Sequence, residues 1–340
     1  MIDLLIVGAG PVGLVTAIHA AEAGLQVTVV EPRVGTIDKA CGEGLMPDAL
    51  HHLASIGIDP PGVDFYGIRY LSGKRVAEAR FSSGPGRGVR RTTLHDCLWG
   101  RAKELNVNFV EGRVDTVVQS GACVEAAGIQ SRYLIGADGL HSTVRSQLNL
   151  GIASKRSRPQ RYGVRQHFAV APWTDFVEVY WLDNAEVYVT PVDQQTIGVA
   201  VLGKDKINFD EIISRVPMLR RHLESAEPAS KLRGAGPLRQ DVPARSRGRV
   251  LLVGDAAGYV DALTGEGMRV GFAEGQAAVL AVLANDPQSY EAQWQRITRS
   301  YRLLAGGLLW ASSNHIIRSM IVPAAQTFTP VFSRLVNTLG

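Results

Sequence analysis

The sequence predicts an α/β fold with a parallel sheet flanked by helices, an inserted antiparallel sheet and a helical C-terminus. Three observations support this class. An apolar strand at residues 4–7 meets a glycine-rich turn and a helix, which is typical of a βαβ unit. Residues 155–245 contain long strand-like runs, and residues 287–340 have mostly helical periodicity. With 340 residues, 46% hydrophobic and 20% charged, the chain can bury a large core, and we expect two domains or one with an insert.

The first element is a strand followed by a Gly-x-Gly-x-x-Gly turn. Gly8 permits the sharp bend, Gly10 lets the backbone approach a pyrophosphate, and Gly13 lets the helix pack closely on the strand. The helix directs its N-terminal amides and the positive end of its dipole at the phosphates. A second apolar run ends in Glu31, the position that accepts hydrogen bonds from ribose hydroxyls. The pattern predicts a Rossmann-type dinucleotide site and leaves FAD and NAD(P) both open.

Alternating short elements follow. Pro47 is suited to the first turn of a helix that reaches residue 56, and residues 64–71 and 75–81 are predicted strands. Thr92 or Thr93 can cap the next helix, which carries apolar residues at helical spacing. Further strands are predicted at residues 108–110, 114–118, 123–126 and 132–135, and a helix at 210–223.

Two later strands also end in acidic motifs. One strand ends in Asp138-Gly139, and another ends in Gly254-Asp255 before a helix that reaches residue 283. In an open α/β sheet, ligands bind beyond the carboxyl ends of the strands. We therefore expect these motifs and the first glycine-rich turn to surround one cofactor.

The three motifs together, at residues 8–13, 136–145 and 254–258, resemble those of FAD-dependent oxidoreductases of the para-hydroxybenzoate hydroxylase fold. The resemblance covers roughly residues 1–280 and favours FAD. It implies a glutathione-reductase-like FAD-binding domain, an inserted β-sheet substrate domain and a C-terminal helical segment. The FAD-binding domain is predicted at residues 1–63, 85–155 and 245–286, the insert at 64–84 and 156–244, and the helical segment at 287–340.

The resemblance also implies roles for individual residues. Glu31 holds the adenosine ribose, Arg33 lies beside the adenine, and Asp255 accepts a hydrogen bond from the ribityl chain. Asp138 organises the loops around the pyrophosphate; helix capping is the alternative for both aspartates. The predicted FAD-binding residues are Gly8, Gly10, Pro11, Val12, Gly13, Glu31, Arg33, Ala40, Cys41, Gly42, Arg91, Val114, Asp138, Gly139, Gly254, Asp255, Gly265, Glu266, Gly267 and Met268.

Two glycine-rich loops point to a sub-branch. Residues 264–268 open the long helix, whose free amides can stabilise negative charge on a reduced flavin. Gly258 stands where aromatic hydroxylases usually carry His, and together with residues 41–44 this resembles the geranylgeranyl reductase branch. The Trp-x-Trp-x-Ile-Pro motif of flavin halogenases is absent from the sequence.

The candidate catalytic residues are Cys41 and Glu43. Cys41 either shapes the flavin pocket or donates a proton there, or it fills a tight turn. His141 and His167 are expected to be structural. The sequence contains no metal-ligand spacing and no second Rossmann unit, so an NAD(P)H donor is expected to visit the flavin transiently.

Three functions remain open. The favoured one is an FAD-dependent monooxygenase that hydroxylates an apolar phenolic, polyketide-like or lipid-like small molecule. The alternative is a reductase of carbon–carbon double bonds in a prenyl-type lipid, indicated by the loops around Cys41 and Gly265. A third possibility is a flavin-binding carrier without turnover.

Composition limits the partners and the compartment. The net charge of +4 is spread along the chain without a basic helix interleaved with aromatics, which argues against nucleic-acid binding. Three unpaired cysteines suit a reducing compartment, and the N-terminus runs directly into a strand, so we expect a cytoplasmic protein. Membrane contact through residues 287–340 is expected to be peripheral at most. The sequence leaves the substrate and the oligomeric state open.

Overall fold

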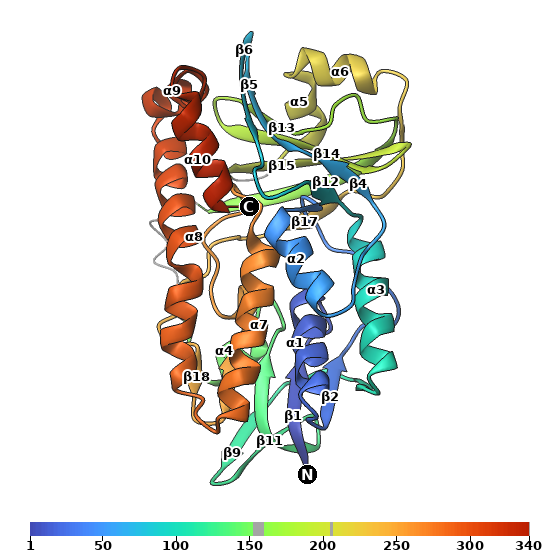
Figure 1. Cartoon of the computed structure of the whole chain (residues 1–340), viewed down its shortest axis with the longest axis vertical. Helices are drawn as coiled ribbons and strands as arrows, with labels where there is room; N and C mark the ends of the chain where they lie inside the picture. Colours follow the sequence, from blue (N-terminus) through green and yellow to red (C-terminus); the bar gives the residue numbers. More distant parts are fainter. Residues whose placement is uncertain (152–159, 205–206, 340) are drawn as a thin grey trace.

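The computed structural model describes residues 1–151, 160–204 and 207–339, and the predicted border between residues 155 and 156 lies outside them. Figure 1 shows an elongated molecule with one sheet in its lower part and a second sheet in its upper part. The predicted α/β class is confirmed, with an N-terminal parallel sheet, an inserted sheet and C-terminal helices.

The lower sheet contains the predicted βαβ unit. Its parallel strands lie in the order β19-β11-β1-β2-β8; β18 pairs antiparallel with β19, and β10 pairs antiparallel with β11 and β9. The strands are β1 (Ile2–Val7), β2 (Val27–Glu31), β8 (Asn108–Glu111), β9 (Val117–Ser120), β10 (Cys123–Ala126), β11 (Ile129–Gly136), β18 (Ser246–Arg247) and β19 (Val250–Leu252). The helices of this part are α1 (Pro11–Glu22), α2 (Pro47–Ser55), α3 (Arg91–Glu104), α4 (Thr143–Gln147) and α7 (Gly267–Leu283), with the 3-10 turn η1 (Gly254–Ala256).

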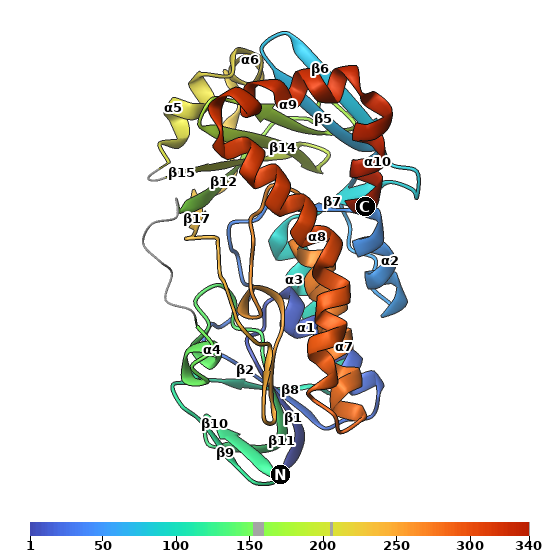
Figure 2. The same cartoon turned by 90° about the vertical axis from the view of Figure 1, so that its left-hand side faces the viewer.

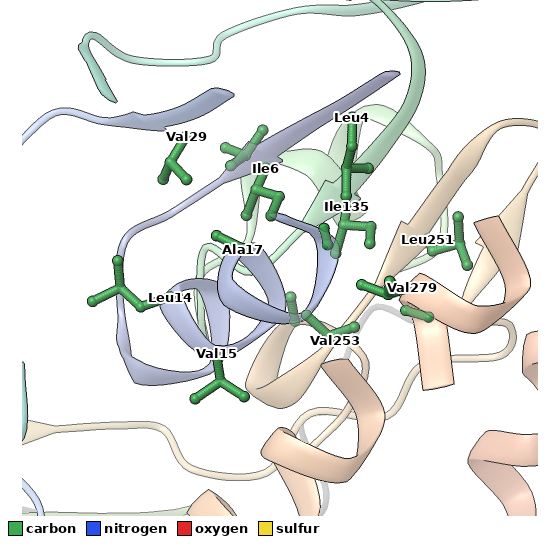
Figure 3. Packing of buried hydrophobic residues seen from close by; sticks show 14 of the residues in the cluster. Leu4, Ile6, Leu14, Val15, Ala17, Val29, Ile135, Leu251, Val253 and Val279 are labelled. Atoms are coloured by element: carbon green, nitrogen blue, oxygen red, sulfur yellow. The ribbon is translucent and has the colours of Figure 1, made fainter. Parts of the chain in front are cut away.

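Apolar side chains on these strands and helices form one core. The central strands are buried almost throughout, as expected for a parallel sheet covered on both faces. Figure 3 shows side chains of β1, β2, β11 and β19 meeting those of α1 and α7, with Ala17 beside Ile6 and Val253 beside Val279. This core fixes the strand ends that carry the three motifs.

The upper sheet has the order β16-β12-β15-β14-β13-β5-β6, and β17 also pairs with β12. All its pairs are antiparallel except β13 with β5. Its strands are β5 (Gly67–Ser72), β6 (Arg75–Arg80), β12 (Arg161–Ala169), β13 (Val177–Trp181), β14 (Ala185–Asp193), β15 (Thr196–Lys204), β16 (Glu227–Pro228) and β17 (Arg233–Ala235). Helices α5 (Phe209–Ser214) and α6 (Pro217–Leu223) pack on one face, and the opposite face lines a cavity.

Three sequence-based expectations were wrong in detail. The predicted strand 64–71 divides at Tyr66, so that β4 (Val63–Phe65) joins a small sheet with β3 (Gly44–Leu45) and β7 (Gly86–Gly88). The predicted helix 210–223 is interrupted before Pro217, whose ring starts a new helix. Thr92 and Thr93 do not cap α3, because the Glu43 carboxylate accepts the Arg91 N–H at 2.8 Å instead.

The C-terminal segment forms three helices, α8 (Ser289–Ser313), α9 (His315–Thr327) and α10 (Thr329–Leu339). Figures 1 and 2 show α8 running along the molecule from the lower sheet to the upper one, where α9 and α10 lie against β6. Among the described helices, none combines the length and the hydropathy needed to cross a bilayer.

Candidate functional site

A large cavity of about 1390 Å³ lies between the two sheets. Its polar part is formed by the strand ends of β1, β2, β11 and β19, and its apolar part by the inner face of the upper sheet. Ordinary small-molecule sites occupy roughly 300–1,000 Å³, so this cavity has room for a cofactor together with a substrate. It extends as far as Val336 on α10.

The glycine-rich turn meets the cavity at Gly10. A Cβ on Gly13 would lie 2.0 Å from the Gly8 carbonyl oxygen, so Gly13 serves helix packing. Gly10 differs, because its φ of −67° and ψ of 170° suit any residue. The nearest atom to a Cβ on Gly10 would be Nη2 of Arg91 at 3.9 Å. The fold therefore does not require glycine here, whereas a ligand close to the backbone does.

Glu31 is buried beside this turn. Its carboxylate accepts the Ala9 N–H at 2.9 Å and the Arg33 guanidinium at 2.6 and 2.9 Å. Burial alone would raise the pKa of Glu31, but the hydrogen bonds from Arg33 and Ala9 hold it below its ordinary value. Glu31 is thus an ionised acceptor at the position predicted for the ribose.

Three cations, Lys39, Arg33 and Arg91, line the polar part of the cavity. Desolvation and the charges of Arg33 and Arg91 lower the pKa of Lys39. A diphosphate would relieve this repulsion, and the free amides at the N-terminus of α1 add donors for the same anion. The donor set therefore fits the diphosphate of a dinucleotide.

Asp138 and Asp255 lie at the ends of their strands and also line the cavity. Oδ2 of Asp138 accepts the Val144 N–H at 3.1 Å, so the capping alternative holds for that oxygen, while Oδ1 is buried without a partner among the described residues. Burial raises the pKa of Asp255, although Lys39 and Arg91 act against the shift. Both carboxylates can accept hydrogen bonds from the hydroxyl groups of a ligand.

Cys41 and Glu43 occupy one loop at the cavity wall. Sγ of Cys41 accepts the Glu43 N–H at 3.4 Å, and burial raises the pKa of the thiol, so Cys41 keeps its proton at neutral pH.

Glu43 is buried and has a left-handed φ of 60°, a strained conformation for a residue with a side chain. Oε2 of its carboxylate lies 2.5 Å from Nε2 of His167 on β12, and Oε1 accepts the Arg91 N–H. These contacts tie the Cys41 loop to α3 and to the upper sheet, so Glu43 is a positioning residue. His167, also bonded to Ser230, is structural as expected.

The second glycine-rich loop leads into α7. Gly265, Gly267 and Met268 line the cavity, and the first amides of α7 have no acceptor within the helix. Glu266 does not line the cavity: its carboxylate pairs with Arg269 at 2.5 Å and lies 1% exposed. The side chain of Glu266 therefore lies outside the cavity wall, and the predicted role of this residue in cofactor binding stays a prediction.

At the cavity wall the structure brings together all the predicted site residues except Gly13 and Glu266, which do not line the cavity. Lys39 joins them at the cavity wall without a predicted role, and Arg145 supports them from outside that wall. Lys39 stands in a polar loop and gave no sequence signal. Arg145 ends the predicted motif at 136–145 and donates to the carbonyls of Asp255 and Ala256, which holds two strand-end loops together. Within the described chain, no group of three or more His, Cys, Asp or Glu is placed to hold a metal.

A buried acid on α7 gives a pH prediction. Glu274 accepts the Gly254 N–H at 2.6 Å, and burial raises its pKa from 4.5 to about 8. Because the pKa of Glu274 is raised in the folded state, the contribution of this residue to the free energy of unfolding is fully present below pH 4.5 and is lost as pH rises through about 8. The melting temperature should fall over this window, and Glu274→Gln should flatten the fall in calorimetry. An exposed control, Glu224→Gln, should follow the wild type; an unchanged slope in Glu274→Gln would contradict the assignment.

Family models place this site among flavoproteins. The model described as "FAD binding domain" matches residues 99–284, and the model described as "FAD dependent oxidoreductase" matches residues 3–49.

Relatives and solved structures agree with these models. A menaquinone reductase of Mycolicibacterium smegmatis is 28% identical over 88% of this chain and 80% of its own length. A digeranylgeranylglycerophospholipid reductase of Methanosarcina acetivorans is 26% identical over 87% of this chain and 81% of its own. The p-nitrophenol 4-monooxygenase of Pseudomonas putida superposes with a TM-score of 0.81 at 18% identity, covering 99% of this chain and 96% of that one, which shows the shared fold.

Proposed function

This chain belongs to the family defined by that FAD-binding domain and is an FAD-dependent oxidoreductase, and from that premise we propose that it saturates a carbon–carbon double bond of a prenyl-type lipid. The FAD-binding residues are proposed to be those at the polar cavity wall. The diphosphate would be held by Lys39, Arg91 and the α1 amides. The ligand hydroxyls would be bound by Asp138 and Asp255, and the flavin ring by the α7 amides.

The observation that carries this proposal is the Cys41 thiol in the cavity wall. Among the described residues lining the cavity, Cys41 is the one thiol, and burial keeps it protonated. The same cavity continues over an apolar surface that includes Ile68, Val177 and Leu263. A protonated donor beside an apolar chamber suits a substrate that has a double bond and no polar group to activate.

The relatives support the same choice over the monooxygenase favoured by the motifs. Both are named as reductases, and one acts on a lipid whose name includes geranylgeranyl chains. The monooxygenase superposes at 18% identity, which supports the fold alone.

Reduced FAD, when bound, supplies a hydride to one carbon of the double bond. The Cys41 thiol gives its proton from Sγ to the other carbon, which completes the saturation and leaves a thiolate. Solvent then returns a proton to Sγ, and a two-electron donor such as NAD(P)H must supply the electrons. Glu43 has its carboxylate occupied by Arg91 and His167, so its part is to hold the Cys41 loop in place.

Product analysis tests the reaction. The FAD-loaded protein is mixed with NADPH or dithionite and geranylgeraniol, under nitrogen and under isotopically labelled O₂. We expect a product that gains two hydrogen atoms in both gases. A product that carries one labelled oxygen atom would instead establish the monooxygenase.

Replacing Cys41 tests the donor. Cys41→Ala and Cys41→Ser should retain FAD but lose turnover on the order of a hundredfold, because a positioned proton donor contributes about that much. The half-buried Cys97 on α3 does not line the cavity, so Cys97→Ala should keep full turnover. Full activity in Cys41→Ala, with FAD retained, would remove Cys41 from the mechanism.

A further inference from the structure

The three C-terminal helices expose large apolar side chains to solvent. Seven of them are between 43% and 75% exposed, and together we call them the C-terminal apolar face: Leu303, Trp310, Ile316, Met320, Phe328, Val331 and Leu335. They recur at helical spacing, seven residues apart on α8, four apart on α9, and three and four apart from Phe328, at the end of α9, through Val331 and Leu335 on α10. Helices α8, α9 and α10 contact one another, so these exposed side chains lie on neighbouring helices.

This face is additional to the core. The inner side of α10 already buries Phe332 and Val336, and α9 buries Val322 against the upper sheet. The seven apolar residues of the face leave 43–75% of their surface to solvent. Exposed apolar surface of this extent marks an interaction site in a folded protein.

The charged side chains of residues 292–340 have one sign. Residues 292–340 contain no Asp or Glu but five arginines, although the whole chain has 32 acidic residues. One of the five, Arg318, is buried in an ion pair with Glu186. The other four are exposed: Arg296, Arg299, Arg302 and Arg334. Exposed apolar side chains flanked by cations are typical of helices that lie in a membrane interface.

Helix α10 joins this face to the cavity. Val336 lines the cavity, whereas Val331 and Leu335 on the same helix are exposed. One helix thus separates the apolar chamber from the apolar face. A lipid bound at the face would lie next to the wall of the chamber that we assign to the prenyl substrate.

We propose that the C-terminal apolar face docks peripherally on an anionic lipid bilayer, with Arg299, Arg302 and Arg334 at the headgroups. The bilayer then delivers a lipid substrate beside α10; this second part rests on the proposed function, whereas docking does not. A second copy of the chain fits the face less well. A two-fold contact would bring the arginines of both copies together, with no acidic residue at 292–340 to pair with them.

Vesicle flotation tests the docking. The full-length, FAD-loaded protein is mixed with phosphatidylcholine vesicles, with or without phosphatidylglycerol. We expect it to float with the anionic vesicles and to be released as salt is raised. Phe328→Glu with Val331→Glu should weaken binding at least about tenfold, because two apolar side chains are replaced by anions. Met218→Glu is the matched control: Met218 on α6 is 51% exposed and lies outside the face, so binding should persist.

Three outcomes would overturn the proposal. These are failure of the wild type to float, equal flotation of the double variant, or a dimer in mass measurements that the double variant abolishes. Retained FAD and an unchanged melting temperature show that the double variant is folded. Flotation without any lipid reduction would reject the proposed function alone. Reduction of a short water-soluble prenyl alcohol by a protein that does not float would reject docking alone.

Discussion

Replacing Gly10 with valine is expected to abolish FAD binding and to leave the fold intact. Gly10 has backbone angles open to any residue, and a Cβ there would meet only the Arg91 side chain at 3.9 Å. The valine would fill the place where the backbone approaches the diphosphate. We expect FAD affinity to fall by about a hundredfold or more, ~2.8 kcal/mol. The flavin-to-protein absorbance ratio after purification and the far-UV circular dichroism spectrum measure the two effects separately.

Gly13→Val is the contrasting variant. Its Cβ would lie 2.0 Å from the Gly8 carbonyl oxygen, so α1 could not keep its contact with β1 and the protein should misfold. A Gly10→Val protein that purifies with stoichiometric FAD would show that the diphosphate lies elsewhere.

The second large effect is expected at Glu186, which is fully buried on β14. Its carboxylate pairs with Arg161 at 2.5 Å and with Arg318 of α9 at 2.7 Å. Glu186→Ala would remove the carboxylate that pairs with the buried Arg318 and leave Arg161 with Asp261, at 2.9 Å, so we expect a loss of roughly 3–5 kcal/mol in the free energy of unfolding. Denaturation in urea measures this loss.

A surface pair provides the control. Glu78 is 45% exposed and pairs with Arg69 at 2.7 Å, so Glu78→Ala should cost no more than about 1 kcal/mol. Equal losses in the two variants would show that the Glu186 pairs do not hold α9 to the upper sheet. Because Arg318 belongs to α9, limited proteolysis after Glu186→Ala should also cut the C-terminal helices first.

The elements that could be predicted from the sequence are those encoded locally. Gly8 adopts a left-handed φ of 104° at the bend, and a Cβ on Gly13 would lie 2.0 Å from the Gly8 carbonyl oxygen, so the spacing of these glycines predicts the turn locally. Asp138 and Asp255 follow buried strands, and the order of strands in a parallel sheet places both at one edge. These features predicted the fold and the polar half of the cavity.

The other features depend on contacts between distant segments. Glu43 was predicted as a candidate catalytic residue, yet its carboxylate meets His167, 124 positions away, and takes over the capping expected of Thr92 or Thr93. Lys39 enters the cavity from a loop without a motif. The reaction was equally hard to predict, because the motifs describe the cofactor half of the site and the substrate half is built from ordinary apolar residues.

Saturation of a lipid double bond can be followed through the flavin itself. The FAD-loaded protein is reduced under nitrogen with one equivalent of dithionite and mixed with geranylgeraniol, and the oxidised flavin band is followed. We expect the band to return without O₂, in step with formation of the saturated product, and not to return in Cys41→Ala. A band that stays bleached until O₂ is admitted, with oxygen then found in the product, would contradict this expectation.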